Sequence, residues 1–269
     1  MKLTVLVDNN VYIDHYYLGE PALSFWIEDG DEKILFDTGY SNCFIENAEK
    51  LKIDLSQVST LALSHGHNDH TGGLPFFNQY LKTTKPKLVA HPQAFFPKQA
   101  VEGSIGSPLS LAELADNYQL QLSTAPVQLS ENILFLGEIP QLVDFEPRQQ
   151  VGEYQAAEAY QPDYVFDDSA LVFTGKAGLY IITGCSHSGI CNICEYAKQV
   201  TGQTKIAGVI GGFHLFEENT QLQATINYFK ENQIEILYPC HCVSFFAKSA
   251  IHQEIAIGEV GVGLTLEWQ

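Results

Sequence analysis

Three histidines and one aspartate lie within six positions of this chain, directly after an apolar run. The run covers residues 58–64 and is almost continuously apolar, as expected of a buried strand. His65 and His67 are two positions apart just beyond this strand, so they can point to one side and close on one metal ion. Asp69 and His70 follow and can hold a second ion or a bridging water. The segment predicts a sheet with a metal site at its edge.

Short apolar runs alternate with helix-like stretches along the rest of the chain, which is typical of an α/β protein. Strands are predicted at residues 3–8, 22–28, 33–37, 58–64, 87–90, 132–137, 170–174, 179–183, 205–210, 234–238 and 262–267. Helices are predicted from after Ser41 to about Leu51 and at residues 189–200, 220–231 and 244–251.

No Pro/Gly-rich linker divides the 269 residues, so we expect one domain over residues 1–269. Residues 97–118 contain Gly, Ser and Pro before a short helix, and residues 146–163 have the weakest pattern in the chain. We interpret both segments as mobile insertions, and the second as a flap or lid.

Acidic side chains outnumber basic ones by 32 to 14, which gives a formal net charge of −18. Such a surface repels phosphate backbones and excludes a general nucleic-acid-binding protein. A small anionic substrate stays compatible with this charge if bound metal ions offset it locally. The chain has no apolar run of the ~18 residues that a membrane span needs, and its start lacks a secretory signal pattern. We therefore expect a cytoplasmic protein without a membrane partner, whose six cysteines are thiols.

The H-x-H-x-D-H segment resembles the signature of the metallo-β-lactamase-fold hydrolases. Residues 35–39 (Leu-Phe-Asp-Thr-Gly) resemble the strand-end aspartate motif of that fold, and residues 238–241 (Tyr-Pro-Cys-His) resemble its late histidine motif. The resemblance covers about residues 20 to 245. It implies an α/β fold of the metallo-β-lactamase type, a four-layer αβ/βα sandwich with the metal ions at one edge of the two sheets. Further segments, at residues 137–140, 167–170, 183–190 and 211–215, resemble the subfamily grouped with the dihydropterin ribofuranosyl-aminobenzene phosphate synthase.

The resemblance also implies two divalent metal ions, with zinc as the first expectation and manganese, iron or magnesium as alternatives. The usual bridging aspartate has no match in this chain, which leaves its place to Cys185 or to a solvent hydroxide. We expect Asp37 to lie behind the ligands and to fix an imidazole by a hydrogen bond, and we place Cys185 beside the ligands as well. The expected ligands of the first ion are His65, His67 and His187, and those of the second are Asp69, His70 and His241.

Two residues are expected to act in catalysis. Asp69 would orient the attacking water and accept its proton. His214 would face the substrate and contact a carboxylate or phosphate, although a ligand role stays open. Outside this set, His91 is interpreted as a pocket or structural histidine, and Cys191 with Cys194 as packing residues of a helix.

These observations predict a metal-dependent hydrolase or related transferase that uses metal-activated water on a small, anionic substrate. Two alternatives stay open: a di-iron-type redox protein, and a non-catalytic metal- or ligand-binding protein on the same fold. Bound flavin would favour the first alternative, and tight metal binding without turnover would favour the second. The expected partner is a small-molecule substrate, and the oligomeric state, including a homo-oligomer, is left open.

Overall fold

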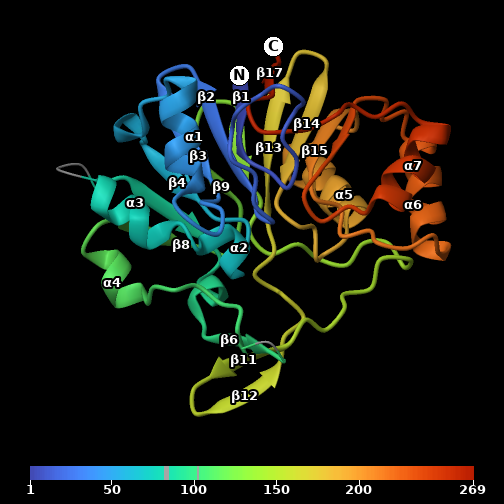
Figure 1. The fold of residues 1–269 in the computed structure, drawn as a ribbon. Coiled ribbons are helices and arrows are strands. Elements are labelled where there is room, and N and C mark those ends of the chain that lie inside the picture. The colour runs from blue at the N-terminus through green and yellow to red at the C-terminus, as the bar shows by residue number, and fades with distance from the viewer. Residues whose placement is uncertain (82–84, 102) are drawn as a thin grey trace.

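The first of two larger sheets is built from strands between residues 2 and 122 and from the last strand of the chain. The computed structural model describes residues 1–81, 85–101 and 103–269. The strands of this sheet are β1 (Lys2–Val7), β2 (Ser24–Asp29), β3 (Glu32–Phe36), β4 (Thr60–Ala62), β5 (Lys87–Ala90), β8 (Gln119–Leu122) and β17 (Thr265–Glu267). Their order is β17-β1-β2-β3-β4-β5-β8, so the last strand of the chain pairs with the first. The two termini consequently lie side by side (Figure 1).

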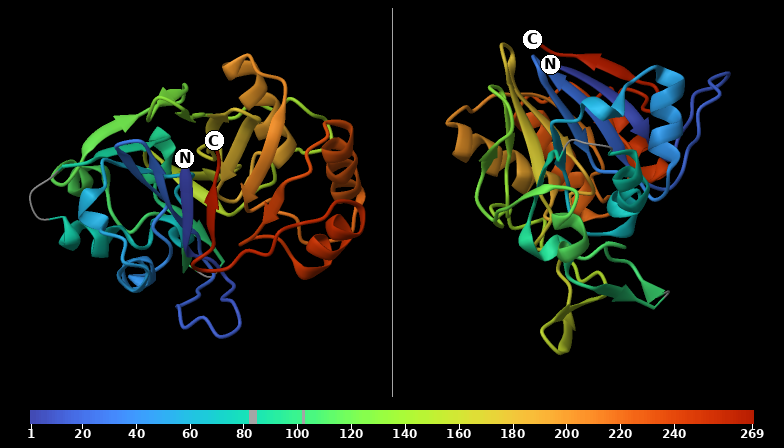
Figure 2. Two further views of the ribbon diagram at one scale, coloured as in Figure 1. Left: turned by 90° about the horizontal axis from the view of Figure 1, so that it is seen from above. Right: turned by 90° about the vertical axis from the view of Figure 1, so that its left-hand side faces the viewer.

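The second larger sheet is built from strands between residues 127 and 239. Its strands are β9 (Val127–Gln128), β10 (Ile133–Phe135), β13 (Ala170–Gly175), β14 (Gly178–Thr183), β15 (Ile206–Gly211) and β16 (Leu237–Pro239). Their order is β16-β15-β14-β13-β10-β9. The two sheets face each other in the middle of the molecule, as the view from above in Figure 2 shows.

Side-chain alternation along the strands separates three layers of apolar core. Successive residues of a strand point to opposite faces. On β14, Ile181 therefore packs toward the helices of the second half, while Ile182 packs between the sheets. On β3, Ile34 and Phe36 pack between the sheets, while Leu35 packs toward the helices of the first half. Two helical layers thus enclose two sheets.

The outer layers are formed by helices on both sides. The first sheet is covered by α1 (Cys43–Leu51), α3 (Leu74–Tyr80) and α4 (Leu111–Ala115), and the second by α5 (Ile190–Thr201), α6 (Thr220–Glu231) and α7 (Phe245–Glu254). This arrangement confirms the predicted α/β class and the four-layer αβ/βα sandwich. Among the described residues, no helix has both the length and the apolar character that crossing a bilayer requires.

The two segments that we interpret as insertions meet in a small third sheet. It contains β6 (Lys98–Ala100), β7 (Gly103–Ser104), β11 (Glu153–Ala156) and β12 (Ala159–Pro162), in the order β12-β11-β6-β7. The β11–β12 hairpin projects from one end of the molecule in both side views (Figures 1 and 2). The ends of the second insertion are anchored, because Glu146 and Asp163 are buried. Its mobility stays a prediction.

Several predicted strands are shorter in the structure. The run at residues 58–64 contributes only Thr60–Ala62 to the sheet, and the run at 262–267 contributes only Thr265–Glu267. Strand β8 has no counterpart among the predicted strands, because its Gln-Leu-Gln-Leu sequence is half-exposed at the edge of the first sheet. The residues that leave β4 early are the ones that enter the predicted metal-binding loop.

Candidate metal centre

The segments that carry the predicted ligands follow strands whose carboxyl ends meet at one edge of the two sheets. Strands β1 and β3 both run antiparallel to β2, so they are parallel to each other, and β4 is parallel to β3. In the second sheet, β14, β15 and β16 are mutually parallel. The loops after these strands converge between the sheets, at the end of the molecule that also carries the β11–β12 hairpin (Figure 1).

Three histidines form the first half of the convergence. His65 and His67 follow β4, and His187 follows β14. The Nε2 atom of His65 lies 3.1 Å from the Nδ1 atom of His67. The ring of His187 lies 4.9 Å from that of His65 and 5.0 Å from that of His67, measured between centroids. His65 and His67 are buried and His187 is half-buried. Two loops far apart in the sequence thus present nitrogen donors to one place.

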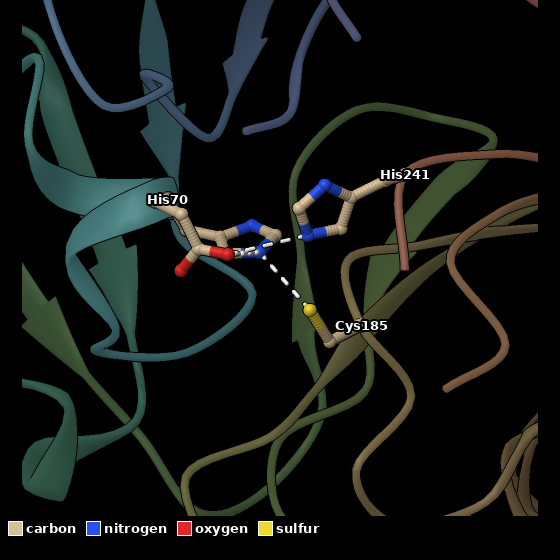
Figure 3. Close-up of side chains that lie close together, drawn as sticks. His70, Cys185 and His241 are labelled. Atoms are coloured by element: carbon tan, nitrogen blue, oxygen red, sulfur yellow. Dashed lines mark hydrogen bonds and ion pairs between the residues drawn. The ribbon is translucent and has the colours of Figure 1, made fainter. Parts of the chain in front are cut away.

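Four side chains form the second half. His70 lies on α2 (Asn68–Thr71), and its Nε2 atom is 3.2 Å from the Sγ atom of Cys185 and 3.6 Å from an Asp69 carboxylate oxygen. The same Asp69 oxygen lies 3.3 Å from the Nε2 atom of His241. Figure 3 shows His70, Cys185 and His241 pointing toward one another from three separate segments. Donor atoms of these four residues all lie within 4.8 Å of one another.

Polar partners behind the ring nitrogens orient three of these histidines. Asp37, at the end of β3, has a carboxylate oxygen 2.7 Å from the Nδ1 atom of His70. The hydroxyl of Ser64 lies 3.0 Å from the Nδ1 atom of His65 and donates to Asp37. The amide oxygen of Asn9 lies 3.1 Å from the Nδ1 atom of His241. In each case the opposite nitrogen, Nε2, is directed into the cluster.

The acidic pair Asp167 and Asp168 ties the two loops that carry the predicted ligands to one segment. A carboxylate oxygen of Asp167 accepts a hydrogen bond from the amide of Gly66, at 2.8 Å, within the His65–His67 loop. A carboxylate oxygen of Asp168 accepts one from the amide of Ser188, at 2.9 Å, next to His187. The pair therefore fixes the loop of each half against the other.

A buried lysine links the small sheet to the same pair. The Nζ atom of Lys98 lies 2.9 Å from Asp167 and 2.7 Å from Asp163, and all three side chains are almost fully buried. Lys98 lies on β6, and Asp163 directly follows β12. Through this ion-pair network the position of the small sheet and the position of the His65–His67 loop depend on each other.

The backbone of the site is held in unfavourable conformations. Asp37, Ser186, His214 and His241 all have positive φ angles, between 50° and 61°. In this left-handed region a residue other than glycine carries a conformational strain on the order of 1 kcal/mol or more. Residues strained in this way concentrate at functional sites. The surrounding hydrogen bonds, such as that from the amide of His241 to Asp8 at 2.9 Å, hold these conformations in place.

Burial keeps most of the clustered imidazoles neutral. Burial lowers the pKa of His65 and His187 well below the ordinary value, and neighbouring imidazoles lower it further. Burial also lowers the pKa of His67, and that of His214 to about 4. Neutral imidazole is the form that binds metal, so these residues are ready to act as ligands at neutral pH.

In the second half of the cluster, the carboxylates of Asp69 and Asp37 oppose the effect of burial on the protonation of His70. Burial disfavours the charged form of His70, but the carboxylates of Asp69 and Asp37 outweigh it and raise its pKa. Burial also disfavours the charge of Asp69, but His70 and His241 outweigh it and lower the pKa of that carboxyl. Asp69 is therefore a carboxylate at neutral pH.

Comparison with known proteins agrees with this arrangement. The family model of the metallo-beta-lactamase superfamily matches residues 18–200, about two thirds of the chain and the part that contains the H-x-H-x-D-H segment. The chain belongs to the metallo-β-lactamase superfamily. The predicted resemblance to that family is thereby confirmed.

Relatives within the superfamily cover almost the whole chain. The uncharacterized protein MJ0448 of Methanocaldococcus jannaschii is 31% identical and covers 96% of this chain and 98% of its own length. The 7,8-dihydropterin-6-methyl-4-(beta-D-ribofuranosyl)-aminobenzene-5'-phosphate synthase of the same organism is 30% identical and covers 94% and 91%. The crystal structure of Tm1679, described as a metal-dependent hydrolase of the beta-lactamase superfamily, superposes with a TM-score of 0.85 at 28% identity, over 99% of this chain and 98% of that one.

Within this superfamily fold, the predicted site residues lie together. His214 follows β15, and its ring lies 4.3 Å from that of His187. The two histidines line a small cavity of about 20 Å³, enough for roughly one water molecule, together with Glu146 and Gln149. The metal and catalytic roles of these residues stay predictions.

His91 lies apart from the clustered donors, as the sequence interpretation expects. It is buried, its Nδ1 atom accepts a hydrogen bond from the amide of Gln93, and its Nε2 atom lies 3.4 Å from Glu138. Cys191 and Cys194 are packed in the apolar core beneath α5. Hydrogen bonds explain the position of His91, and apolar packing explains the positions of Cys191 and Cys194, without a bound metal.

Sequence reasoning missed several residues that support the site. Asn9, Ser64 and Lys98 belong to no motif, and only the fold brings them to the ligands. Glu146 is a further example, because its carboxylate accepts hydrogen bonds from the amides of Cys191 and Asn192 at the start of α5. The only available signal for Glu146 is an acidic residue in a segment that otherwise lacks a pattern.

Proposed function

We propose that this protein is a metal-dependent hydrolase or a related transferase that acts on a small, anionic substrate. The observation that carries the proposal is the convergence of donor side chains from both halves of the fold at one buried edge. Structural sites close around a metal with strong ligands, whereas catalytic sites leave a position for water or substrate. The mixed set of histidines and a carboxylate is typical of the catalytic kind.

The residues fit two divalent ions. Bond lengths of about 2.1 Å to nitrogen and about 2.3 Å to sulfur place two donors of a tetrahedral ion roughly 3.5 Å apart. The contacts of 3.2, 3.3 and 3.6 Å among His70, Cys185, Asp69 and His241 match this spacing. The buried Nε2 atoms of His67 and His187 also have no hydrogen-bond partner among the described residues. A bound cation would satisfy them.

Divalent ions in this place would lower the pKa of a bound water toward about 7 and neutralise developing negative charge. The chain contributes the proton acceptor, since Asp69 is ionised and lies at the centre of the cluster. His214 contributes a neutral ring beside His187 that can donate a hydrogen bond to a carboxylate or phosphate of the substrate. Asp37 holds the ring of His70 in place, and Ser64 holds the ring of His65.

An anionic substrate agrees with the charges near the site. The cation Lys98 is already paired with two carboxylates, and Arg148 donates to the backbone carbonyls of Ile139 and Val165. In a protein of net charge −18, bound metal ions would form the local positive region that attracts an anion. The relative named as a 5'-phosphate synthase supports a phosphorylated substrate in particular.

The test is turnover by metal-replete protein on a panel of phosphate monoesters, phosphodiesters, lactones and carboxylic esters. We expect turnover of at least one anionic class, its loss after treatment with a chelator, and its return on adding metal. Asp69→Asn should remove it, while Asp29→Asn, a buried carboxylate bonded to Ser130 and Asn132 on the opposite side of the molecule, should not. Metal-replete protein that turns over no member of the panel would contradict the proposal.

A further inference from the structure

We propose that the thiolate of Cys185 is a metal ligand shared by both ions. The inference rests on the proposed function and deepens it, because it specifies the ligand that joins the two halves of the site. It departs from the sequence interpretation, which places Cys185 beside the ligands and leaves the bridging position open between this thiol and a solvent hydroxide.

The first observation is that one sulfur atom serves both groups of donors. The donor atom of Cys185 is within 4.8 Å of those of Asp69, His70 and His241, and by the same distance it forms a second group, of three residues, with His65 and His187. A cysteine has one donor atom, so Sγ itself lies between the two groups. Asp69 also occurs in two groups, but its two carboxylate oxygens can serve one group each.

The second observation is that the carboxylates of Asp37 and Asp167 are committed elsewhere. Both oxygens of Asp37 are used, one by the amide of Ser64 and the other by the Ser64 hydroxyl and His70. Both oxygens of Asp167 are used as well, by Gly66 and Lys98. In the described part of the chain, Asp69 is the one carboxylate in the donor groups. Asp168 keeps one buried oxygen without a hydrogen-bond partner among the described residues, but it lies outside these donor groups. The position between the ions is therefore left to sulfur.

The third observation is that the loop around Cys185 is fixed on both sides. The hydroxyl of Ser186 donates to the carbonyl of Gly212, at 2.6 Å, and lies 2.8 Å from the hydroxyl of Thr183. The amide of Gly212 donates to the carbonyl of Gly184, at 2.8 Å. The side chain of Cys185 is 4% exposed, so its thiol cannot turn to solvent without rearranging these contacts. The sulfur is pre-positioned for the ions.

A shared thiolate has two chemical consequences. When a sulfur–metal bond forms, the thiol S–H bond breaks and its proton passes to solvent, so metal uptake releases a proton from Cys185. Sulfur is also a soft ligand, which favours zinc, cobalt or iron over magnesium and manganese. The site would therefore differ in metal preference from one bridged by a carboxylate.

Cobalt substitution tests the inference without an activity assay. Metal-free protein is titrated with Co²⁺, and absorbance is followed in the visible, where bound cobalt shows its ligand-field bands, and in the near ultraviolet, where a thiolate–cobalt bond shows charge transfer. We expect both sets of bands in the wild type. Cys185→Ser should lose the near-ultraviolet band, and Cys185→Asp should recover the wild-type cobalt stoichiometry while lacking that band.

Two matched controls remove other thiols. Cys43→Ser removes a buried thiol at the start of α1, and Cys242→Ser removes the thiol that donates to the carbonyl of Cys185. Both variants should keep the band. A wild type that binds cobalt without the near-ultraviolet band, or a Cys185→Ser variant that keeps it, would overturn the shared thiolate and leave the proposed function standing. A wild type that binds no cobalt would overturn both.

Discussion

The Nδ1 atom of His70 lies 2.7 Å from a carboxylate oxygen of Asp37, and both side chains are fully buried. Asp37 comes from the end of β3, and His70 comes from α2, 33 positions further along the chain. A second hydrogen bond joins the Asp37 carboxylate to the Ser64 hydroxyl, at 2.7 Å, and that hydroxyl faces His65. One buried carboxylate therefore orients a ring in each half of the cluster.

Replacing Asp37 with Asn should weaken metal binding while the fold persists. Loss of a hydrogen-bond partner behind a metal-binding histidine lowers metal affinity by about 10- to 100-fold. The side chain of Asn has a single oxygen and cannot accept hydrogen bonds at both of the positions that Asp37 uses. The measurement is a competition titration with a chromophoric chelator. The control is Asp29→Asn, which should keep the wild-type affinity because Asp29 contacts Ser130 and Asn132 instead. Equal affinity in all three proteins would show that Asp37 does not support the ligands.

Replacing Lys98 with Met should lower the free energy of unfolding by about 3–5 kcal/mol, because two buried carboxylates lose their cation. Lys230→Met removes an ion pair of similar length, 2.6 Å to Glu254, but on the surface. Exposed pairs contribute at most about 1 kcal/mol, so this control should change little. Urea unfolding of both variants measures the difference. Equal losses would mean that burial does not set the strength of the Lys98 network.

The same Lys98→Met variant should show a pH dependence of defined sign. Burial alone would raise the pKa of Asp167, but Lys98 outweighs it and lowers that pKa below 3.8. A carboxyl group whose pKa is lower in the folded than in the unfolded state stabilises the fold above about pH 4. This contribution is lost as the pH falls below about 4. Without Lys98, Asp167 takes up a proton more readily in the folded state. The stability difference between wild type and variant should therefore shrink, not grow, as the pH falls through about 4.

Metal-free protein should lose stability as the pH falls below the ordinary histidine pKa of 6.5. Burial lowers the pKa of His65, His67 and His187, and that of His214 to about 4, so the unfolded chain takes up protons first. His70 acts in the opposite direction because its pKa is raised, but it is one residue against four.

Urea midpoints of chelator-treated protein at about pH 7.5 and about pH 5 check this expectation. The drop between the two should be smaller in His214→Gln than in the wild type. His252→Gln, on the exposed side of α7, should show the wild-type drop. A midpoint that rises on acidification would contradict the neutral state of the buried imidazoles.

Replacing Gly184 with Ala should disrupt the metal centre through a steric clash. An added Cβ would lie 2.2 Å from the hydroxyl oxygen of Ser64, which must then move away from Asp37 and His65. We expect a loss of about 1–3 kcal/mol in stability together with at least tenfold weaker metal binding. Gly202→Ala has open space around it and a positive φ of 71°, so it should cost about 1 kcal/mol and leave metal affinity unchanged. Wild-type metal affinity in Gly184→Ala would show that metal binding does not require the close approach of the Gly184 backbone to Ser64.

The sequence predicts the fold and the central donors because each motif follows an apolar strand. The pattern at residues 58–64 and 179–183 places His65 and His187 at strand ends, and parallel strands bring such ends to one edge. Local information suffices where the functional residue and its supporting strand are neighbours in the chain. The β11–β12 hairpin has no comparable signal, since its side chains are half-buried or exposed on both faces.

The supporting contacts depend on pairings that no local pattern carries. Asp167 and Gly66 are 101 positions apart, and Lys98 and Asp163 are 65 apart. A lysine in a segment of Gly, Ser and Pro gives no sign that it will be buried, because its burial depends on carboxylates brought to it by a distant hairpin. The sequence predicts which side chains can bind metal, and the tertiary structure determines what holds them.

The most direct test of this account is metal content by plasma mass spectrometry on protein purified without chelators or metal-affinity resin. We expect about two equivalents of divalent metal per chain, with zinc foremost. His187→Ala should lose the ion held with His65 and His67, and His241→Ala the ion held with Asp69 and His70. Metal at background level in the wild type, even after incubation with zinc, manganese or iron, would contradict the metal centre and the hydrolase or transferase function built on it.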